Sequence, residues 1–566
     1  MPVVETAPWW RRHPVLTGTA AVLVVALVAA GVFVVVSWLS CGEGMERSQN
    51  DEACVGINLA GEKFSPDQPQ ELTDLVDQVA EYNDAITGDN YVTIVLLLNM
   101  TPVPNVDTAS FADVTRSIQG AITAVWRANH TSAFGKGADP VPRVKLLLAN
   151  TGSRNLDWEP AVDQINAAKE EHHITAVAGL SQSNKETRNA VTRLTTTYHL
   201  PVIGGSVTGD NMDNNVFDEK QLDGFYRIAP TNRGLVTAAA EYIKKLPEFN
   251  PNQGSFGDVA IVWDQSATDD YVKTLHEAAL VHLPGAKDLP YRSSDPTVPI
   301  TNRDSTILGQ LAGVRDALCP APPKVVFFAG RGADLAAFVQ TWTDSGNCST
   351  KPLFLITGDD GVKASTDTRV TTAVKKGTVK VRYTALASPD KWGSCGGVVP
   401  KPPVAHAAEI LAEYRMFEAA FTGDTSCGVD PATLAPDTKP KPLDFPQGAL
   451  ATGQAMIAHD AVGLAIHAAR RIGTAGVLQD RLGQLGTLSQ VKCGLGAGSS
   501  ANTMFGASGW IRYEDPVNEE HSPTGSIVPL IEIGPEGQLT TVQTGLPTTL
   551  PAPLKPGEAP PADPPC

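Results

Sequence analysis

The feature that most constrains this chain is an alternation of short, almost continuously apolar runs with helical stretches. Residues 91–100 (YVTIVLLLNM) and 141–150 (VPRVKLLLAN) have the length and composition of buried strands, and apolar residues between them, at 111–130, recur at helical spacing. Strands that are buried on both faces and joined by single helices are typical of a parallel sheet covered by helices on both sides. We therefore expect an α/β fold.

The alternation runs through two consecutive units, which predicts two lobes at 86–230 and 231–385. The first unit continues with helix 158–172, strand 174–180, helix 185–199 and strand 200–206. The second holds helix 232–246, strand 258–264, helix 270–280, strand 324–330, helix 333–346 and strand 353–358.

The remaining segments flank these two lobes. Residues 386–545 contain helices near 404–421 and 449–471 and a strand-rich stretch at 510–533, too little for a third domain of the same type, so we expect them to complete both lobes. A juxtamembrane segment with a helix is expected at 41–85. The tail at 546–566 is rich in proline, which predicts an extended conformation.

Length and charge narrow the classes of function. With 566 residues and 42% hydrophobic residues, the chain is too long for one compact core and too apolar for disorder. Its formal net charge is -17 and no run of Lys or Arg stands out, which argues against nucleic acid as a partner.

Residues 14–40 carry no charge and are long enough, at about 1.5 Å per residue, to span a hydrocarbon core of roughly 30 Å. We expect an uncleaved membrane helix. A signal peptide is the alternative, but its apolar region is usually about 7–15 residues long, and no A-x-A-like site follows. Arg11 and Arg12 precede this helix while acidic residues follow it, so residues 1–13 are expected in the cytoplasm and the main domain outside the cell, on a single-pass anchor.

Eight cysteines follow the apolar run, where an oxidising compartment allows them to pair. Their 105 possible connectivities leave the pattern open, and the prediction is that neighbours in sequence pair, Cys41 with Cys54 and Cys319 with Cys348. A lipid on Cys41 is the alternative for that residue, although Trp38 stands where a lipobox has Leu. The others are Cys395, Cys427, Cys493 and Cys566.

Ligands of open parallel sheets bind at the carboxyl ends of the strands, where loops expose backbone N–H groups and helix N-termini. In the first lobe these ends hold Ser181 and Ser183 in one loop and Ser206 and Thr208 in the next; helix capping or turn formation is the alternative role for each loop. The corresponding candidates of the second lobe are Gln265, Tyr271, Arg331 and Asp359. Arg331 suits a ligand anion and Asp359 or Asp360 a ligand cation, with surface turns as the alternative.

Catalytic signatures are missing from the sequence. There is no H-E-x-x-H, G-x-S-x-G or G-x-x-x-x-G-K-[ST] motif, and the eleven histidines are scattered, with His172 and His173 best explained as a solvated pair at a helix end. We therefore expect neither enzymatic activity nor a cofactor or metal.

The order of these segments resembles the type 1 periplasmic binding proteins, the group that holds the leucine/isoleucine/valine-binding proteins of ABC importers and the ligand-binding domains of glutamate-type receptors. The resemblance covers roughly residues 90–545. It is carried by Ile174–Ser183 (ITAVAGLSQS), Leu200–Thr208 (LPVIGGSVT), Phe225–Asn232 (FYRIAPTN), Gln454–Arg471 (QAMIAHDAVGLAIHAARR) and Phe505–Tyr513 (FGASGWIRY).

This resemblance implies two lobes, joined by three crossovers, that close on a small ligand without chemistry. The crossovers are expected near Ala229–Pro230, near Arg382–Ser388 and between Ala497 and Gly509. It also implies that the serines and threonine of the first lobe bind the carboxylate and amine of an amino-acid-like ligand. The Tyr-Gly of the family's second lobe is not matched, because Asp270-Tyr271 lacks the glycine.

Three functional hypotheses remain open. The first is a solute-binding protein that serves an ABC permease. The second is a sensor ectodomain that needs a separate signalling partner, since only about thirteen residues are expected in the cytoplasm. An enzyme on the same architecture is the third, disfavoured by the missing motifs.

Overall fold

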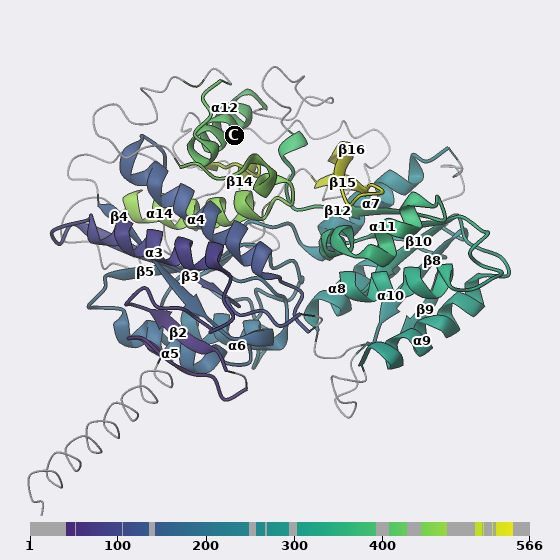
Figure 1. The fold of residues 1–566 in the computed structure, drawn as a ribbon, viewed down its shortest axis with the longest axis horizontal. Helices are drawn as coiled ribbons and strands as arrows, with labels where there is room; N and C mark the ends of the chain where they lie inside the picture. The colour runs from purple at the N-terminus through teal and green to yellow at the C-terminus, as the bar shows by residue number, and fades with distance from the viewer. Residues whose placement is uncertain are drawn as a thin grey trace, which may run out of the picture.

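The chain folds into two α/β lobes that lie side by side (Figure 1). The computed structural model describes residues 41–546 except 51, 105, 135–141, 248, 250–255, 266–268, 294–302, 392–406, 427–428, 430–442, 472–503, 512, 514–522 and 524–527. The expected membrane helix at 14–40, the tail after residue 546 and four of the eight cysteines (Cys395, Cys427, Cys493 and Cys566) lie outside the described residues. Within the described ranges, no helix is long and apolar enough to cross a membrane.

Lobe 1 is built on a seven-stranded sheet with the order β1-β2-β4-β3-β5-β6-β7. Its strands are β1 Met45–Arg47, β2 Cys54–Asn58, β3 Tyr91–Leu98, β4 Arg143–Asn150, β5 Ile174–Gly179, β6 Val202–Gly204 and β7 Phe225–Arg227. The five strands from β4 to β7 pair in parallel, as the sequence predicts. β1 and β2 add an antiparallel edge, so residues expected to lie outside lobe 1 extend its sheet.

Helices cover both faces of this sheet. The helices are α3 Gln70–Asp84, α4 Phe111–His130, α5 Trp158–Ala168, α6 Lys185–Thr192, α12 Ala407–Thr422 and α14 Gln454–Arg471. α3, α4, α12 and α14 share one buried apolar cluster, and α5 and α6 belong to the cluster on the opposite face. Two helices from the last third of the chain therefore complete the core of lobe 1.

Lobe 2 repeats the plan with a sheet of order β16-β15-β12-β11-β10-β8-β9. The strands are β8 Val259–Asp264, β9 Lys287–Tyr291, β10 Val325–Ala329, β11 Leu353–Thr357, β12 Val379–Thr384, β15 Val528–Ile533 and β16 Leu539–Leu546; the helices are α7 Asn232–Lys244, α8 Asp270–His282, α9 Arg303–Leu318, α10 Gly332–Thr343 and α11 Thr368–Lys375. α7 and α8 pack on one face, and α9, α10 and α11 on the other.

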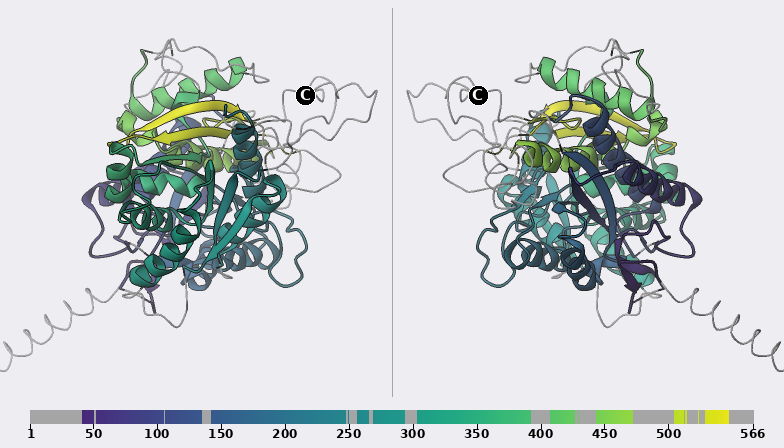
Figure 2. Two further views of the ribbon diagram at one scale, coloured as in Figure 1. Left: turned by 90° about the vertical axis from the view of Figure 1, so that its right-hand side faces the viewer. Right: turned by 90° about the vertical axis from the view of Figure 1, so that its left-hand side faces the viewer.

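The C-terminal segments are shared between the lobes. β15 and β16 join the sheet of lobe 2 in antiparallel fashion, while α12 and α14 belong to lobe 1. In Figure 2, α12 (light green) and the two strands (yellow) lie along the same edge of the molecule.

Three crossovers join the lobes, and the third is displaced from its expected place. The first follows β7, and the second lies between Ala385, in the core of lobe 2, and Ala387, in the core of lobe 1. The described part of the segment expected to cross at 497–509, residues 504–509, instead belongs to a hairpin of β13 Met504–Phe505 and β14 Trp510–Ile511 on lobe 1. The chain crosses back between Tyr513, in the core of lobe 1, and Val528, in the core of lobe 2.

The reason for this displacement is a buried carboxylate on α14. The Oδ1 and Oδ2 atoms of Asp460 accept hydrogen bonds from the backbone N–H of Ala507 at 2.8 Å and of Ser508 at 2.7 Å, which fixes the hairpin to lobe 1. Tyr513 continues this attachment, because its hydroxyl donates to the carbonyl oxygen of Arg227 at 2.9 Å.

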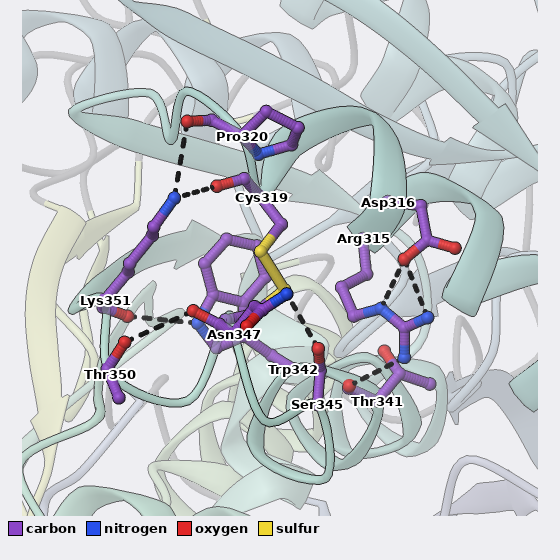
Figure 3. The surroundings of a disulfide bond; sticks show 11 residues. Arg315, Asp316, Cys319, Pro320, Thr341, Trp342, Ser345, Asn347, Thr350 and Lys351 are labelled. Atoms are coloured by element: carbon purple, nitrogen blue, oxygen red, sulfur yellow. Dashed lines mark hydrogen bonds and ion pairs between the residues drawn. A yellow bond between two sulfur atoms is a disulfide. The ribbon is translucent and has the colours of Figure 1, made fainter.

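Both expected disulfides are present, Cys41–Cys54 and Cys319–Cys348. Because the sulfur of Cys41 is bonded to Cys54, it is not available to carry a lipid. The second bond ties the residue after α9 to the turn after α10 (Figure 3), where Lys351 Nζ donates to the carbonyl oxygen of Cys319 at 2.6 Å and Trp342 Nε1 to that of Lys351 at 3.1 Å.

We expect the double replacement Cys319→Ser and Cys348→Ser to lower the free energy of unfolding of lobe 2 by roughly 3–4 kcal/mol, because the bond closes a loop with a sequence separation of 29 residues in the unfolded chain. Urea unfolding followed by tryptophan fluorescence would measure this loss. Treating the unsubstituted protein with a reductant should shift the same transition, and an unchanged transition in the double variant would contradict the prediction.

Candidate functional site

The carboxyl ends of strands from both sheets meet at a cavity between the lobes. The cavity measures about 50 Å³. Since a single water needs roughly 10–15 Å³, this space holds only a few waters or a small ligand fragment. It is lined by Leu98, Asn99, Thr108, Ala109, Asp113, Val114, Ser117, Ser181, Ser183, Ser206 and Gln454 of lobe 1 and by Tyr271, Arg331, Asp359, Asp360, Val362 and Lys363 of lobe 2.

The lobes are closed on each other around this cavity. The backbone N–H of Tyr271 donates to the carbonyl oxygen of Ser183 at 3.2 Å, and the side chain of Asn211 donates to Asp270 Oδ1 at 2.6 Å. The backbone N–H of Asp210 reaches Thr274 Oγ1 at 3.3 Å. These contacts are polar and join residues of different lobes, so the small cavity is a property of the closed arrangement.

The structure brings together most of the site residues predicted from the sequence. Ser181, Ser183, Ser206, Tyr271, Arg331 and Asp359 line the cavity. Thr208 is buried behind it, where its hydroxyl donates to Asp359 Oδ1 at 3.4 Å. Gln265 is exposed at the end of β8 and does not line the cavity.

Lobe 1 presents hydroxyl groups. Ser183 Oγ accepts hydrogen bonds from the backbone N–H groups of Thr208 and Gly209, both at 3.0 Å. A hydroxyl has two acceptor positions and one donor, so the proton of Ser183 remains to be donated. Asn184 caps α6 by accepting from the N–H of Thr187, which leaves Ser181 free of the capping role proposed for this loop.

The loop that carries Ser181 has an unusual backbone. Leu180 adopts a φ of 62°, in the left-handed region that a branched side chain rarely occupies. Its N–H donates to the carbonyl oxygen of Leu97 at 2.8 Å, which holds the chain in this conformation. The turn directs the chain away from the sheet at the point where β5 meets the cavity.

Lobe 2 presents charged groups, and its arginine is already paired. Arg331 donates through Nε and Nη2 to the two carboxylate oxygens of Asp269 at 2.8 and 2.7 Å, and its guanidinium lies 4.3 Å from the ring centre of Tyr271. Burial lowers the pKa of Arg331, but the charge of Asp269 outweighs this and leaves the pKa above its usual value. The role of ligand-anion partner would therefore require Arg331 to share its guanidinium with Asp269.

Two adjacent carboxylates follow β11. Asp360 Oδ2 accepts from the backbone N–H of Gly332 at 2.7 Å, at the start of α10. Asp359 is partly buried, and burial together with the charge of Asp360 raises its pKa to about 7, against an opposing effect of Arg331. Near neutral pH, Asp359 is thus an acceptor that exchanges a proton readily.

Sequence reasoning missed Asp113 and Lys363, which form an ion pair across the cavity. Asp113 lies in a capping box with Ser110 at the start of α4, and the pattern Ser-x-x-Asp before an apolar run is a readable signal for such a box. Lys363 lies in the 3-10 segment Asp359–Thr366, and its position depends on how the lobes dock, which no local pattern encodes.

Chemically, the hydroxyl and charged groups of the arrangement can bind a small polar ligand. Within the part of the chain that the structure describes, no group of three or more His, Cys, Asp or Glu side chains is placed to hold a metal ion. The cavity sets hydroxyl groups and the carboxylate of Asp113 on lobe 1 against two carboxylates and two cationic side chains on lobe 2.

We expect Asp359→Asn to stabilise the protein at pH 8 and to change its stability little near pH 4. Because the folded-state pKa is about 7 and the ordinary value 3.8, the folded state binds more protons than the unfolded state between these values, so the contribution of Asp359 to stability falls as pH rises through this window. Thermal unfolding at both pH values would show a higher Tm for the variant at pH 8 only. Asp316→Asn, at an exposed position, is the control. An equal difference at both pH values would contradict the prediction.

Comparison with known proteins supports the architecture. Similar solved structures include a leucine-binding protein from Thermotoga maritima (14% identity, TM-score 0.50, covering 81% of this chain and 99% of that chain) and an ABC transporter substrate-binding protein from Aeropyrum pernix (15%, 0.51, 81% and 97%). A branched-chain amino acid ABC transporter protein from Thermus thermophilus with bound valine has 11% identity and a TM-score of 0.50, covering 81% and 97%. No protein-family model and no curated protein matches the sequence. The chain has the two-lobed fold of the type 1 periplasmic binding proteins.

Proposed function

We propose that this protein is an extracytoplasmic solute-binding protein that captures a small polar ligand, an amino acid or an amide-like compound, between its two lobes. The observation that carries the proposal is the cavity itself. It lies where strand ends of two separate sheets converge, and it is closed by polar contacts between the lobes rather than by a continuous core. Such a site opens and closes without unfolding either lobe.

The groups around the cavity favour a ligand with a hydrogen-bond acceptor at one end and a cation or hydrogen-bond donor at the other. Ser181 and Ser183 of lobe 1 offer hydroxyl protons, which suit a carboxylate or an amide carbonyl. Ser206 lies beside them in the lining, and its hydroxyl donates to the carbonyl oxygen of Leu180 at 3.4 Å, a contact that a ligand could replace. Asp359 and Asp360 of lobe 2 offer acceptors, which suit an ammonium or an amide N–H. A zwitterionic amino acid or a small amide satisfies both sets at once.

The similar structures point in the same direction. The Thermotoga maritima protein is a leucine-binding protein, and the Thermus thermophilus protein holds valine. At 11–14% identity these proteins share the fold with this chain, so their ligands enter here as support for a class of compound and not for a particular one.

The same comparison supports the choice of partner. Delivery to an ABC-type importer in the membrane is the proposed role, with the apolar segment 14–40 as the anchor. Binding proteins of ABC importers are usually free or lipidated. The sulfur of Cys41 is bonded to Cys54 and is not available for lipidation. This observation supports a second candidate function, a sensor ectodomain with a separate signalling partner.

The test is thermal unfolding of the full chain, purified in detergent under oxidising conditions, against amino acids, amides, sugars and short peptides. A ligand that binds only the folded state stabilises it by about 2.7 kcal/mol at a hundredfold excess over its Kd. We expect an amino acid or amide to raise Tm, and Ser181→Ala and Ser206→Ala to reduce this rise.

The matched control is Thr196→Ala. Thr196 lies in the segment that follows the C-terminal end of α6, away from the cavity, and its hydroxyl donates to the carbonyl oxygen of Thr192. It should leave the ligand-induced rise in Tm unchanged. A cooperatively unfolding protein that responds to no compound of the panel, or only to sugars, would refute the proposed ligand class.

A further inference from the structure

One ion pair has both of its partners in the lining of the cavity and on different lobes: Asp113, at the third position of α4, and Lys363, in the 3-10 segment after β11. The two residues are 250 positions apart in sequence. Their side chains are only 10% and 22% exposed, so the pair is better shielded from solvent than most surface pairs. It bridges the cavity that the proposed ligand would occupy.

The two partners differ in what they would lose if the lobes separated. Asp113 keeps partners on lobe 1, because its carboxylate also accepts from the N–H and the hydroxyl of Ser110, at 2.9 and 2.6 Å, and from Arg116 at 3.4 Å. Lys363 has no such support: among the residues that the structure describes, only Asp113 pairs with its ammonium group. Separation would therefore leave Lys363 as an unpaired cation at the cleft.

The other charged groups of the cavity do not change partners in this way. Arg331 is held by Asp269, and Asp360 by the N–H of Gly332, and both contacts lie within lobe 2. Among the described residues of lobe 1, Asp359 contacts the hydroxyl of Thr208 through a hydrogen bond of 3.4 Å. Among the cavity charges, the attraction that depends most on closure is that between Asp113 and Lys363.

We propose that the Asp113–Lys363 ion pair is a latch that favours the closed arrangement of the lobes in the absence of ligand, and that it thereby sets the affinity of the cleft. The part about affinity rests on the proposed function; the part about closure does not. A ligand that binds the closed state gains apparent affinity in proportion to the population of that state. Weakening the latch should thus open the empty protein and weaken binding by a similar factor.

The latch can be tested without any ligand by hydrogen exchange of the full chain. The amide of Asp210 reports closure, because it donates to Thr274 Oγ1 of the other lobe. We expect Lys363→Met to speed exchange at Asp210 by about fivefold, as for the loss of one partly exposed ion pair. Amides inside one sheet, such as that of Val326 in β10, should keep their rates.

Lys324→Met is the matched control, since it removes a Lys–Asp pair, with Asp258 at 2.7 Å, that lies wholly within lobe 2. Exchange at Asp210 that rises in the Lys363 variant and not in the Lys324 variant supports the latch. An unchanged rate in the Lys363 variant, or an equal rise in both variants, overturns it. Lys363→Gln should reproduce the effect, which guards against a misfolded Met variant.

Because hydrogen exchange is measured without a ligand, the proposed latch and the proposed function can be refuted independently of each other. A ligand panel without any response would leave the exchange result intact. Conversely, a clear ligand response with unchanged exchange in Lys363→Met would keep the binding function and reject the latch.

Discussion

Lobe 1 depends on the packing of α14 across α4, two helices that are more than 300 residues apart in the chain. Gly120 makes the contact possible, because a Cβ atom there would lie 2.0 Å from the carbonyl oxygen of Ala455. Buried polar groups extend the contact: Arg127 Nη1 donates to Glu413 Oε1 at 2.7 Å and lies 3.0 Å from Nε2 of His459. Lobe 1 thus has no complete core until the last third of the chain returns to it.

This constraint produces the hinge. A chain that builds lobe 1, then lobe 2, and then completes both must cross between them three times. The apolar clusters of the two lobes share Leu386, at the second crossover, as a packing neighbour, whereas the surfaces that meet at the cavity are joined by hydrogen bonds and ion pairs. Apolar cores are costly to open, but polar contacts exchange with water at little net free energy, so motion between the lobes is the easiest large rearrangement available.

The sequence predicts what local patterns determine. The bounds of α4 can be predicted at 111–130 because its apolar residues follow helical spacing. β9 could not be found in this way, since it is an exposed edge strand that contains Pro290. The third crossover was misplaced because Asp460 fixes residues 507–508 from a distant helix. Most of the site residues that were predicted from strand ends line the cavity. Gln265 does not, which shows that a position at the end of a strand does not by itself place a side chain in the cavity.

The charges of the closed cavity restrict how the proposed ligand is recognised. Arg331 and Lys363 are both paired with aspartates, so a ligand carboxylate would accept hydrogen bonds from hydroxyl groups rather than from free cations. The same hydroxyl donors would bind a neutral carbonyl oxygen nearly as strongly. The opposite end is more selective. Asp359, with a pKa of about 7, carries a proton for part of the time at neutral pH. A ligand cation beside it favours the ionised form, so the binding of an ammonium group there would release a proton and strengthen as pH rises through neutrality.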